Sequence, residues 1–241
     1  MTELQAPEAI LFLDFDGTIT QRDAVDAILE MYADATWLEF EAEWHAGRMG
    51  SRDCLQAQMG LVRASRQQLD SLLDEIEIDE GLTSLLELCA LHDIAAHIIS
   101  DGFDYCIRRI LSRANKRVHS LLRGARFCAS RLEARGNQWR TSFPFFHQTC
   151  AHGCATCKPA VMRLLNPANA AAIFVGDGLS DRYAAESADL VFAKSGLARY
   201  CRENSVEHVS YNTLEDVAQH LDRWLVASAF IESETEKRAS A

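Results

Sequence analysis

The chain has 241 residues, of which 48% are hydrophobic, and carries a formal net charge of -11. This length fits one large domain or one domain with a sizeable insertion, and the apolar content suffices for a full core. The acidic balance argues against nucleic acid or an anionic membrane as a partner, and no apolar run approaches the ~20 residues of a membrane span. Residues 1–8 carry no signal-like segment, so we expect a cytoplasmic protein whose eight cysteines are thiols or metal ligands.

The first predicted element is a buried strand over residues 9–14, whose apolar run leads into Asp14-Phe15-Asp16-Gly17-Thr18. Ligands bind at the carboxyl ends of strands in open α/β sheets. Two acids this close together repel each other unless a cation or a proton lies between them. The motif therefore predicts a divalent-metal site at which one carboxylate attacks phosphorus.

Residues 21–79 show helical spacing and no convincing strand, so they predict an insertion of about four helices. Three aromatic residues in it recur at helical spacing, which favours core packing over a substrate pocket. These residues are Trp37, Phe40 and Trp44.

Residues 80–230 alternate between helical and strand patterns, with a weak hairpin pattern over 126–146. Strands are predicted at 94–99, 171–175 and 190–193, and helices at 82–92, 103–118, 160–165, 182–187 and 213–230. This alternation predicts an α/β fold with a Rossmann-like, doubly wound parallel sheet. We expect residues 1–20 and 80–230 to form the core, residues 21–79 a helical cap, and residues 231–241 a flexible tail.

Four signals lie where a predicted strand ends or a helix begins, and each carries a side chain that phosphoryl transfer needs. The carboxyl ends of adjacent parallel strands point to one crevice. Phosphoryl transfer requires an in-line nucleophile, a bridging cation and fixed positive donors around the phosphoryl oxygens. The four signals are Asp14-Phe15-Asp16, Ser100-Asp101, Lys158, and Asp177 with Asp181.

Asp14 is the candidate nucleophile, which would form an aspartyl-phosphate. Asp16 can protonate the leaving alcohol and later deprotonate water. Ser100 and the backbone around Asp101 can hold the phosphoryl group, although a serine there is also an ordinary helix cap. Lys158 would neutralise charge on the phosphoryl group and on Asp14; on its own it would be read as a surface lysine.

Asp177 would complete an oxygen-rich site that suits one Mg²⁺ per chain. Asp181 is predicted to orient Lys158 or a metal-bound water. The alternative reading of Asp181 is an acid placed at a helix start because the helix dipole favours it.

These four signals resemble, in order and spacing, the four motifs of the haloacid dehalogenase-like phosphohydrolases, over about residues 9–195. The resemblance implies a Mg²⁺-dependent phosphomonoesterase, with Asp14, Asp177 and the backbone carbonyl of Asp16 as metal ligands. An insertion between the first two motifs is typical of a helical cap of the phosphoserine phosphatase kind. A small phosphorylated metabolite is then the expected substrate, and the sequence does not indicate an oligomeric state.

A closer resemblance is to the phosphatases of methionine salvage. It is carried by the residues from Asp14 to Asp23, by Trp37, Trp44, Gly47 and Ser51 in the cap, and by Cys154-Ala155-Thr156-Cys157-Lys158-Pro159. The same segment is similar to phosphocholine and phosphoethanolamine phosphatases. Asp23 stands where phosphoserine phosphatases have a glutamate that meets the substrate amine. The alternatives are therefore a phosphoserine-like or phosphocholine-like phosphatase and, in other classes, a phosphotransferase or a non-catalytic scaffold.

Substrate selection is predicted to involve Asp23, Thr18 and Arg52. The segment before Lys158 raises a separate question. Cys150, Cys154 and Cys157 have spacings at which Zn²⁺ can bind, but no second paired motif exists in the chain, so we favour unliganded thiols over zinc. Lys158 beside Cys157 suggests the hypothesis that this thiol has a lowered pKa and is readily oxidised.

Overall fold

The computed structural model describes residues 8–239, with side chains described through residue 227. Seven strands form one sheet in the order β4-β3-β2-β1-β5-β6-β7. All neighbouring strands are parallel except β3 and β4, which form an antiparallel hairpin. The strands are β1 (Ala9–Leu13), β2 (Ala95–Phe103), β3 (Phe127–Arg135), β4 (Gln138–Ser142), β5 (Ala171–Gly176), β6 (Leu190–Ala193) and β7 (Val209–Ser210).

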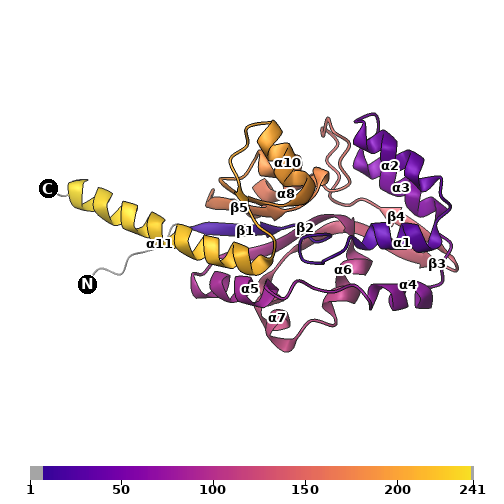
Figure 1. Cartoon of the computed structure of the whole chain (residues 1–241), viewed down its shortest axis with the longest axis horizontal. Helices are drawn as coiled ribbons and strands as arrows, with labels where there is room; N and C mark the ends of the chain where they lie inside the picture. The colour runs from indigo at the N-terminus through magenta and orange to yellow at the C-terminus, as the bar shows by residue number, and fades with distance from the viewer. Residues whose placement is uncertain (1–7, 240–241) are drawn as a thin grey trace.

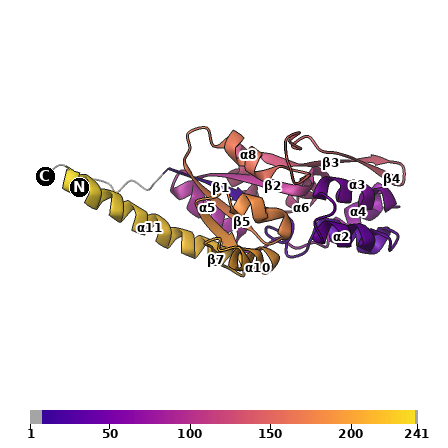
Figure 2. The same ribbon diagram turned by 90° about the horizontal axis from the view of Figure 1, so that it is seen from above.

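Helices cover both faces of this sheet (Figures 1 and 2). The α-helices are α1 (Ala24–Tyr32), α2 (Trp37–His45), α3 (Ser51–Leu61), α4 (Arg66–Leu73), α5 (Leu82–Leu91), α6 (Asp104–Leu111), α7 (Lys116–Leu121), α8 (Lys158–Leu165), α9 (Arg182–Ala185), α10 (Ser195–Glu203) and α11 (Leu214–Ala239). The alternation of helices and parallel strands confirms the predicted α/β, doubly wound class.

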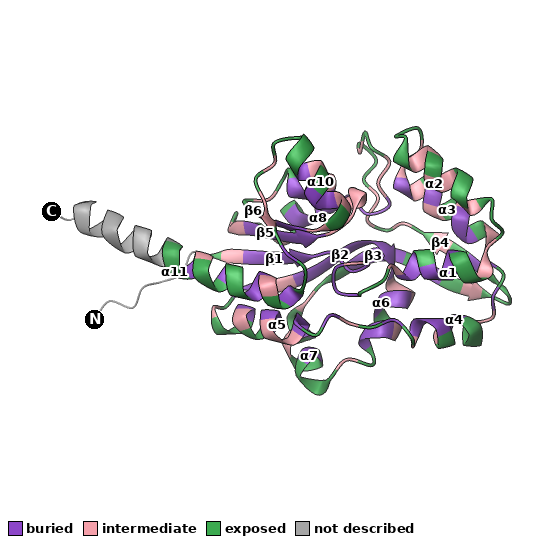
Figure 3. Cartoon of the chain, viewed as in Figure 1, coloured by how far each residue is buried: buried purple, intermediate pink, exposed green. Residues whose placement is uncertain are grey.

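Strand β1 shows why the sheet needs cover on both sides. Leu11 and Leu13 belong to a core cluster that includes α5 and α11, whereas Ile10 and Phe12 belong to a second cluster with α8 and α10. Successive side chains of a strand point to opposite faces, so a continuous apolar run is buried on both. Figure 3 shows the strands as the buried centre of the molecule.

The segment 21–79 contains the four helices α1 to α4, as the sequence predicted. It lies beyond the carboxyl end of β1, next to the β3–β4 hairpin (Figure 1). Trp139 of β4 donates from Nε1 to the carbonyl oxygen of Ala64 at 2.9 Å, and the amide of Ala64 donates to the carbonyl of Asn137 at 3.1 Å. The hairpin therefore holds the helical segment beside the sheet.

The prediction that the cap aromatics serve core packing holds for Trp37, which packs against the main core cluster, and is wrong for Trp44, which lines a cavity. Helix α2 has no buried residue, and Trp37, Phe40 and Trp44 are each only partly buried. The spacing of three to four residues correctly indicates one helix face, but that face is shared between the core, at Trp37, and a cavity, at Trp44.

Several other elements differ from the sequence prediction. Neither α10 nor β7 was predicted, and the helix expected over 103–118 is two helices, because Asn115 caps a new one by accepting the amide of Val118 at 2.9 Å. Helix α11 is longer than the predicted 213–230. The flexible tail predicted for 231–241 lies outside the residues whose side chains are described. Among the described residues, no helix has both the length and the apolar character needed to cross a bilayer.

Candidate active site

The first motif forms a tight turn at the carboxyl end of β1. The amide of Asp14 still pairs with the sheet, since it donates to the carbonyl of Val175 at 2.9 Å. Beyond it, the backbone turns at Gly17, which has a φ of 71°. A Cβ at Gly17 would collide with the carboxylate of Asp177. Glycine is therefore required twice here, for the left-handed conformation and for the close approach to Asp177.

Lys158 is buried beneath this turn as the first residue of α8. Its Nζ lies 2.6 Å from Oδ1 of Asp14 and also pairs with Oδ1 of Asp181, and the lysine side chain is 1% exposed. Burial by itself lowers the pKa of Lys158, but Asp14, Asp181 and Asp101 outweigh it and raise that pKa above its usual range. The ammonium is therefore a fixed positive charge at the end of β1.

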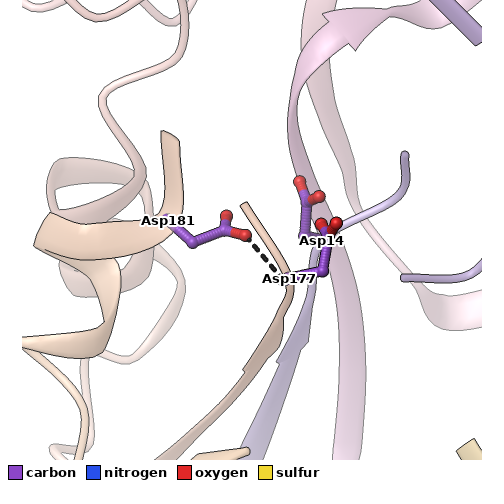
Figure 4. Close-up of side chains that lie close together, drawn as sticks. All are labelled: Asp14, Asp177 and Asp181. Carbon is purple, nitrogen blue, oxygen red and sulfur yellow. Dashed lines mark hydrogen bonds between the residues drawn. The ribbon is translucent and has the colours of Figure 1, made fainter. Parts of the chain in front are cut away.

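Asp181 holds two parts of the site at once. Its Oδ1 faces Lys158, and its Oδ2 accepts the amides of Asp177 at 3.0 Å and of Gly178 at 3.1 Å. Figure 4 shows Asp181 reaching toward Asp177 from the neighbouring turn. Both oxygens are thus engaged, which agrees with the predicted role of orienting Lys158.

Three carboxylates meet at this point with few cations to balance them. Asp14, Asp177 and Asp181 each have an oxygen within 4.8 Å of the others. Burial and then Asp181 raise the pKa of Asp14 well above its usual range, and the same two causes raise the pKa of Asp177 to about 7. Hard oxygen donors around excess negative charge fit Mg²⁺. Because Lys158 and two amides engage Asp181, Asp14 and Asp177 are the side chains with oxygens left for a metal.

Asp16 points toward the start of α1 and toward the second motif. Its Oδ1 accepts the amide of Ala24 at 2.9 Å, and Ser100 donates from Oγ to its Oδ2 at 3.5 Å. The Oγ of Ser100 in turn accepts the amide of Gly102 at 3.0 Å. Burial and then Asp23 raise the pKa of Asp16 well above its usual range, which favours the protonated acid.

A cavity of about 360 Å³ opens over these residues. Asp14, Asp16, Ser100 and Asp177 line it from the core. Its remaining wall includes residues that sequence reasoning missed. These are Glu41, His45, Cys54, Leu55 and Gln58 from α2 and α3, and Arg199, Tyr200 and Glu203 from α10. Trp44, for which the sequence offered a pocket as the alternative to core packing, also lines the cavity.

The predicted specificity residues differ in where they lie. Asp23 lines the cavity and caps α1 by accepting the amide of Val25 at 2.7 Å. Arg52 lies instead over the ring of Phe146, with 4.2 Å from Cζ to the ring centroid, and is not among the residues that line the cavity. Thr18 is fully buried under Tyr211, whose hydroxyl lies 3.5 Å from its Oγ1.

Asp101 was predicted to help hold phosphate, and its carboxylate has other partners. It accepts from the Oγ of Ser51 and from the amide of Thr156, the latter at 3.2 Å. These bonds join α3 to the segment before Lys158. Any contact of Asp101 with a phosphoryl group therefore falls to its backbone, and the predicted role stays a prediction.

The hypothesis that Lys158 lowers the pKa of Cys157 is wrong. Burial raises the pKa of the Cys157 thiol, and Cys150 raises it further. The ammonium of Lys158 points away into the carboxylate cluster, where Asp14 and Asp181 are its partners.

Comparison with known proteins agrees with this geometry. The profile of the haloacid dehalogenase-like hydrolases matches residues 11–186. A 2-hydroxy-3-keto-5-methylthiopentenyl-1-phosphate phosphatase of Geobacillus thermodenitrificans (strain NG80-2) is 26% identical over 219 residues, covering 90% of this chain and 96% of the relative. The phosphatase of the same name from Brevibacillus brevis (strain 47 / JCM 6285 / NBRC 100599) is 28% identical over 217 residues, covering 89% and 95%.

The fold is similar to a solved phosphoserine phosphatase that carries an analogue of the phospho-aspartyl intermediate. The TM-score is 0.68 at 15% identity, and the match covers 89% of this chain and 99% of that one. The chain therefore belongs to the haloacid dehalogenase-like hydrolases, within which it is a phosphatase. The family and the enzyme class predicted from the motifs are confirmed.

Proposed function

We propose that the chain is a Mg²⁺-dependent phosphomonoesterase that works through an aspartyl-phosphate on Asp14. The observation that carries this proposal is the buried contact of 2.6 Å between Nζ of Lys158 and Oδ1 of Asp14 at the carboxyl end of β1. Mg²⁺ held by Asp14, Asp177 and the carbonyl of Asp16 would neutralise charge on the phosphoryl oxygens.

In the first half of the reaction, a carboxylate oxygen of Asp14 attacks phosphorus in line with the leaving oxygen. Lys158 stabilises the negative charge on the phosphoryl oxygens, and the hydroxyl of Ser100 holds one of them. The position of Lys158 is fixed in advance by Asp181, so little reorganisation is needed during the transfer.

Asp16 carries the proton in both halves of the reaction. Its raised pKa keeps a proton available for the leaving alcohol. The resulting carboxylate then takes a proton from the water that hydrolyses the aspartyl-phosphate. The bond from the amide of Ala24, at 2.9 Å, ties this acid to the first residue of α1.

The helical segment 21–79 is proposed to act as a cap over a core formed by residues 1–20 and 80–230. Support comes from the cavity, which is lined by both parts. A closed cap would exclude water while the leaving group is held and would select that group by shape and charge.

The substrate we propose is the methylthiopentenyl phosphate ester named for the relatives in Geobacillus and Brevibacillus. Val25, Trp44 and Leu55 give the cavity an apolar side against which a methylthio group can pack. The cavity volume of about 360 Å³ suits a small metabolite. A cytoplasmic site of action and a small phosphorylated metabolite as the partner belong to the same proposal.

A second candidate is a phosphate ester that carries a cationic group, such as phosphoserine, phosphoethanolamine or phosphocholine. It is favoured by the three carboxylates that the helical segment 21–79 places on the cavity wall, those of Asp23, Asp26 and Glu41. Trp44 beside them can face a quaternary ammonium group.

The test is kcat/KM with Mg²⁺ on the methylthiopentenyl phosphate, phosphoserine, phosphoethanolamine, phosphocholine and simple sugar phosphates. We expect one substrate to reach about 10⁴ M⁻¹s⁻¹ or more and to exceed the others clearly. An Asp14→Asn variant prepared in parallel controls for contaminating phosphatases. Phosphoryl transfer to an added alcohol in competition with water would instead favour a phosphotransferase, and absence of turnover on every ester would contradict the proposal.

A further inference from the structure

A buried pair of polar side chains lies where the helical segment 21–79 meets the sheet. Ser51, the first residue of α3, donates from Oγ to Oδ2 of Asp101 near the end of β2. Each of the two residues is only 9% exposed. They lie fifty residues apart in the chain, and the reaction proposed above uses neither side chain.

Each member of this pair also accepts one backbone amide of the segment that leads into Lys158. The Oγ of Ser51 accepts the amide of Ala155 at 2.9 Å, and Oδ1 of Asp101 accepts the amide of Thr156 at 3.2 Å. A backbone N–H can only donate, so the hydroxyl proton of Ser51 goes to Asp101, and both carboxylate oxygens are engaged. Because a buried amide without an acceptor is costly, these bonds fix the segment in place.

The two acceptors are themselves held by the elements that carry them. The backbone carbonyl of Asp101 accepts from Oγ of Ser130 in β3 at 3.0 Å. The backbone of α3 meets the same segment, because the amide of Arg52 donates to the carbonyl of Gly153 at 3.1 Å and a Cβ at Gly50 would collide with Gly153. The carboxylate is thus fixed by the sheet and the hydroxyl by α3, and both hold one stretch of backbone.

We propose that Asp101 and Ser51 are positioning residues, which place Lys158 for catalysis by holding the backbone that precedes it. Thr156 lies two positions before Lys158, the first residue of α8. Nζ of Lys158 lies 2.6 Å from Oδ1 of Asp14 in a buried site, so a shift of the backbone there changes this distance. The effect on turnover rests on the proposed phosphatase function, whereas the effect on the position of Lys158 does not.

The alternative role is a direct contact with the leaving group, since both residues also line the cavity. The two roles predict different kinetics. A displaced Lys158 lowers kcat on every phosphate ester, because the lysine acts on the phosphoryl group that all of them share. Loss of a contact with the leaving group raises KM instead, and only for esters that carry the matching group.

The first experiment measures kcat and KM of variants of the full chain with Mg²⁺ on the esters of the substrate panel. Ser51→Ala removes the hydroxyl without a change of charge. We expect kcat to fall about tenfold or more on each ester with KM within about twofold, since a misplacement of ~1 Å at a catalytic group costs about a hundredfold. Asp101→Asn should lose at least as much.

Three further variants separate positioning from a general loss of structure. Combining Ser51→Ala with Asp101→Asn should cost no more than about the larger single loss, because both substitutions release the same backbone. Ser51→Thr keeps the hydroxyl and should recover most of the activity. Asp53→Asn, at an exposed position of α3 outside the cavity lining, is the matched control and should change neither constant.

The second experiment follows Lys158 without turnover. The chain has four lysines, so ¹⁵N-labelled protein gives few ammonium signals in an NMR spectrum, and Lys158→Met identifies the one that belongs to Lys158. We expect this signal to shift in Ser51→Ala and to stay unchanged in Asp53→Asn. Ser51→Ala is the decisive variant, because it leaves the charges around the ammonium unaltered.

Three results would overturn the proposal. These are a retained kcat in both Ser51→Ala and Asp101→Asn, a rise in KM confined to one class of ester, and an unchanged Lys158 signal in Ser51→Ala. If the unaltered chain hydrolyses none of the esters, the proposed function fails, and the ammonium signal still decides whether this pair positions Lys158.

Discussion

The two walls of the cavity are built in different ways. On the core side, Lys158 and Asp181 are almost fully buried, and their charged atoms are paired with each other, with Asp14 or with backbone amides. On the other side, α2 has no buried residue, and its ion pair of Glu41 with His45 joins side chains that are 24% and 57% exposed. We call the side that carries Asp14, Lys158, Asp177 and Asp181 the core wall, and the side formed by α2, α3 and α10 the helical wall. Substitutions in the core wall should reduce the stability of the protein strongly, whereas substitutions in the helical wall should reduce it little.

The free energies of buried and exposed ion pairs show how large this difference is. Removing one partner from a buried ion pair leaves an uncompensated charge and costs about 3–5 kcal/mol. An exposed pair contributes about 0–1 kcal/mol. Substitutions on the core wall should therefore alter chemistry and folding together, and substitutions on the helical wall, Ser51 excepted, should alter substrate preference alone.

The largest effect is expected for Asp14→Asn, which removes the nucleophile of the core wall. We expect kcat to fall by about 10⁴-fold or more, while Mg²⁺ binding largely survives through Asp177 and the carbonyl of Asp16. Steady-state kinetics and calorimetric titration with Mg²⁺ measure the two quantities. Turnover retained in this variant would remove Asp14 from the role of nucleophile.

Lys158→Met should damage both catalysis and folding. The methionine nearly preserves volume but leaves Asp14 and Asp181 without their shared cation, so we expect the free energy of unfolding to fall by about 3 kcal/mol or more. Urea unfolding measures this value. Lys116→Met, at an exposed position in the first turn of α7, is the matched control and should leave stability unchanged. Equal stability of the two variants would mean that the buried cluster is not held by Lys158.

Asp16→Asn tests the proton donor and should depend on the leaving group. An alkyl alcohol needs protonation as it leaves, and an aryl alcohol needs it much less. We therefore expect a loss of about 10²-fold or more on alkyl phosphates and a clearly smaller one on aryl phosphates. The comparison requires kcat/KM for both ester classes with the same enzyme preparation. Equal losses on the two classes would count against the acid role.

The core wall could be predicted from the sequence because its residues follow strand ends. Apolar runs mark β1, β2 and β5, and the residues just after or at the end of each run, Asp14, Ser100 and Asp177, meet at one sheet edge. Asp181 was predicted to orient Lys158 or a metal-bound water, and its carboxylate pairs with Lys158. Strand order and chain spacing alone fix this part of the site.

The helical wall could not be predicted in the same way. Helix periodicity groups Ser51, Leu55 and Gln58 on one face but does not say where that face points. Arg52 lies one position off it, which is why its guanidinium meets Phe146 and not the cavity. Helix α10 was missed altogether, so Tyr200 and its neighbours on the cavity wall had no signal that identified them.

The excess negative charge of Asp14 and Asp177 should make the free energy of unfolding depend on pH, and Mg²⁺ should change this dependence. Without Mg²⁺, the pKa of Asp177 is about 7 in the folded state and 3.8 as the ordinary value. Between these values the folded state holds a proton that the unfolded state has lost, so the free energy of unfolding falls as pH rises from 4 to 7. The raised pKa of Asp14 acts in the same direction.

Saturating Mg²⁺ should therefore raise Tm by about 5 °C at pH 8 and by much less at pH 5, where protons compete for the same oxygens. Thermal scans with Mg²⁺ and with a chelator measure the difference. Asp177→Asn should remove most of the Mg²⁺ effect. An equal shift of Tm at both pH values would contradict the assignment of Asp177 as a ligand.

The smallest effects are expected on the helical wall, and they decide between the two candidate substrates. Glu41→Gln removes one of the cavity carboxylates while keeping its shape. If the substrate carries a cationic group, KM should rise about tenfold with kcat nearly unchanged, because only a contact remote from phosphorus is lost. If it carries a methylthio group, KM should stay the same, and Trp44→Ala should raise it instead through lost apolar contact.

Glu39→Gln on the same helix, exposed and outside the cavity lining, is the matched control and should change neither constant. A large fall in kcat for Glu41→Gln would erase the distinction between the two walls, since it would mean that α2 contributes to the chemistry itself.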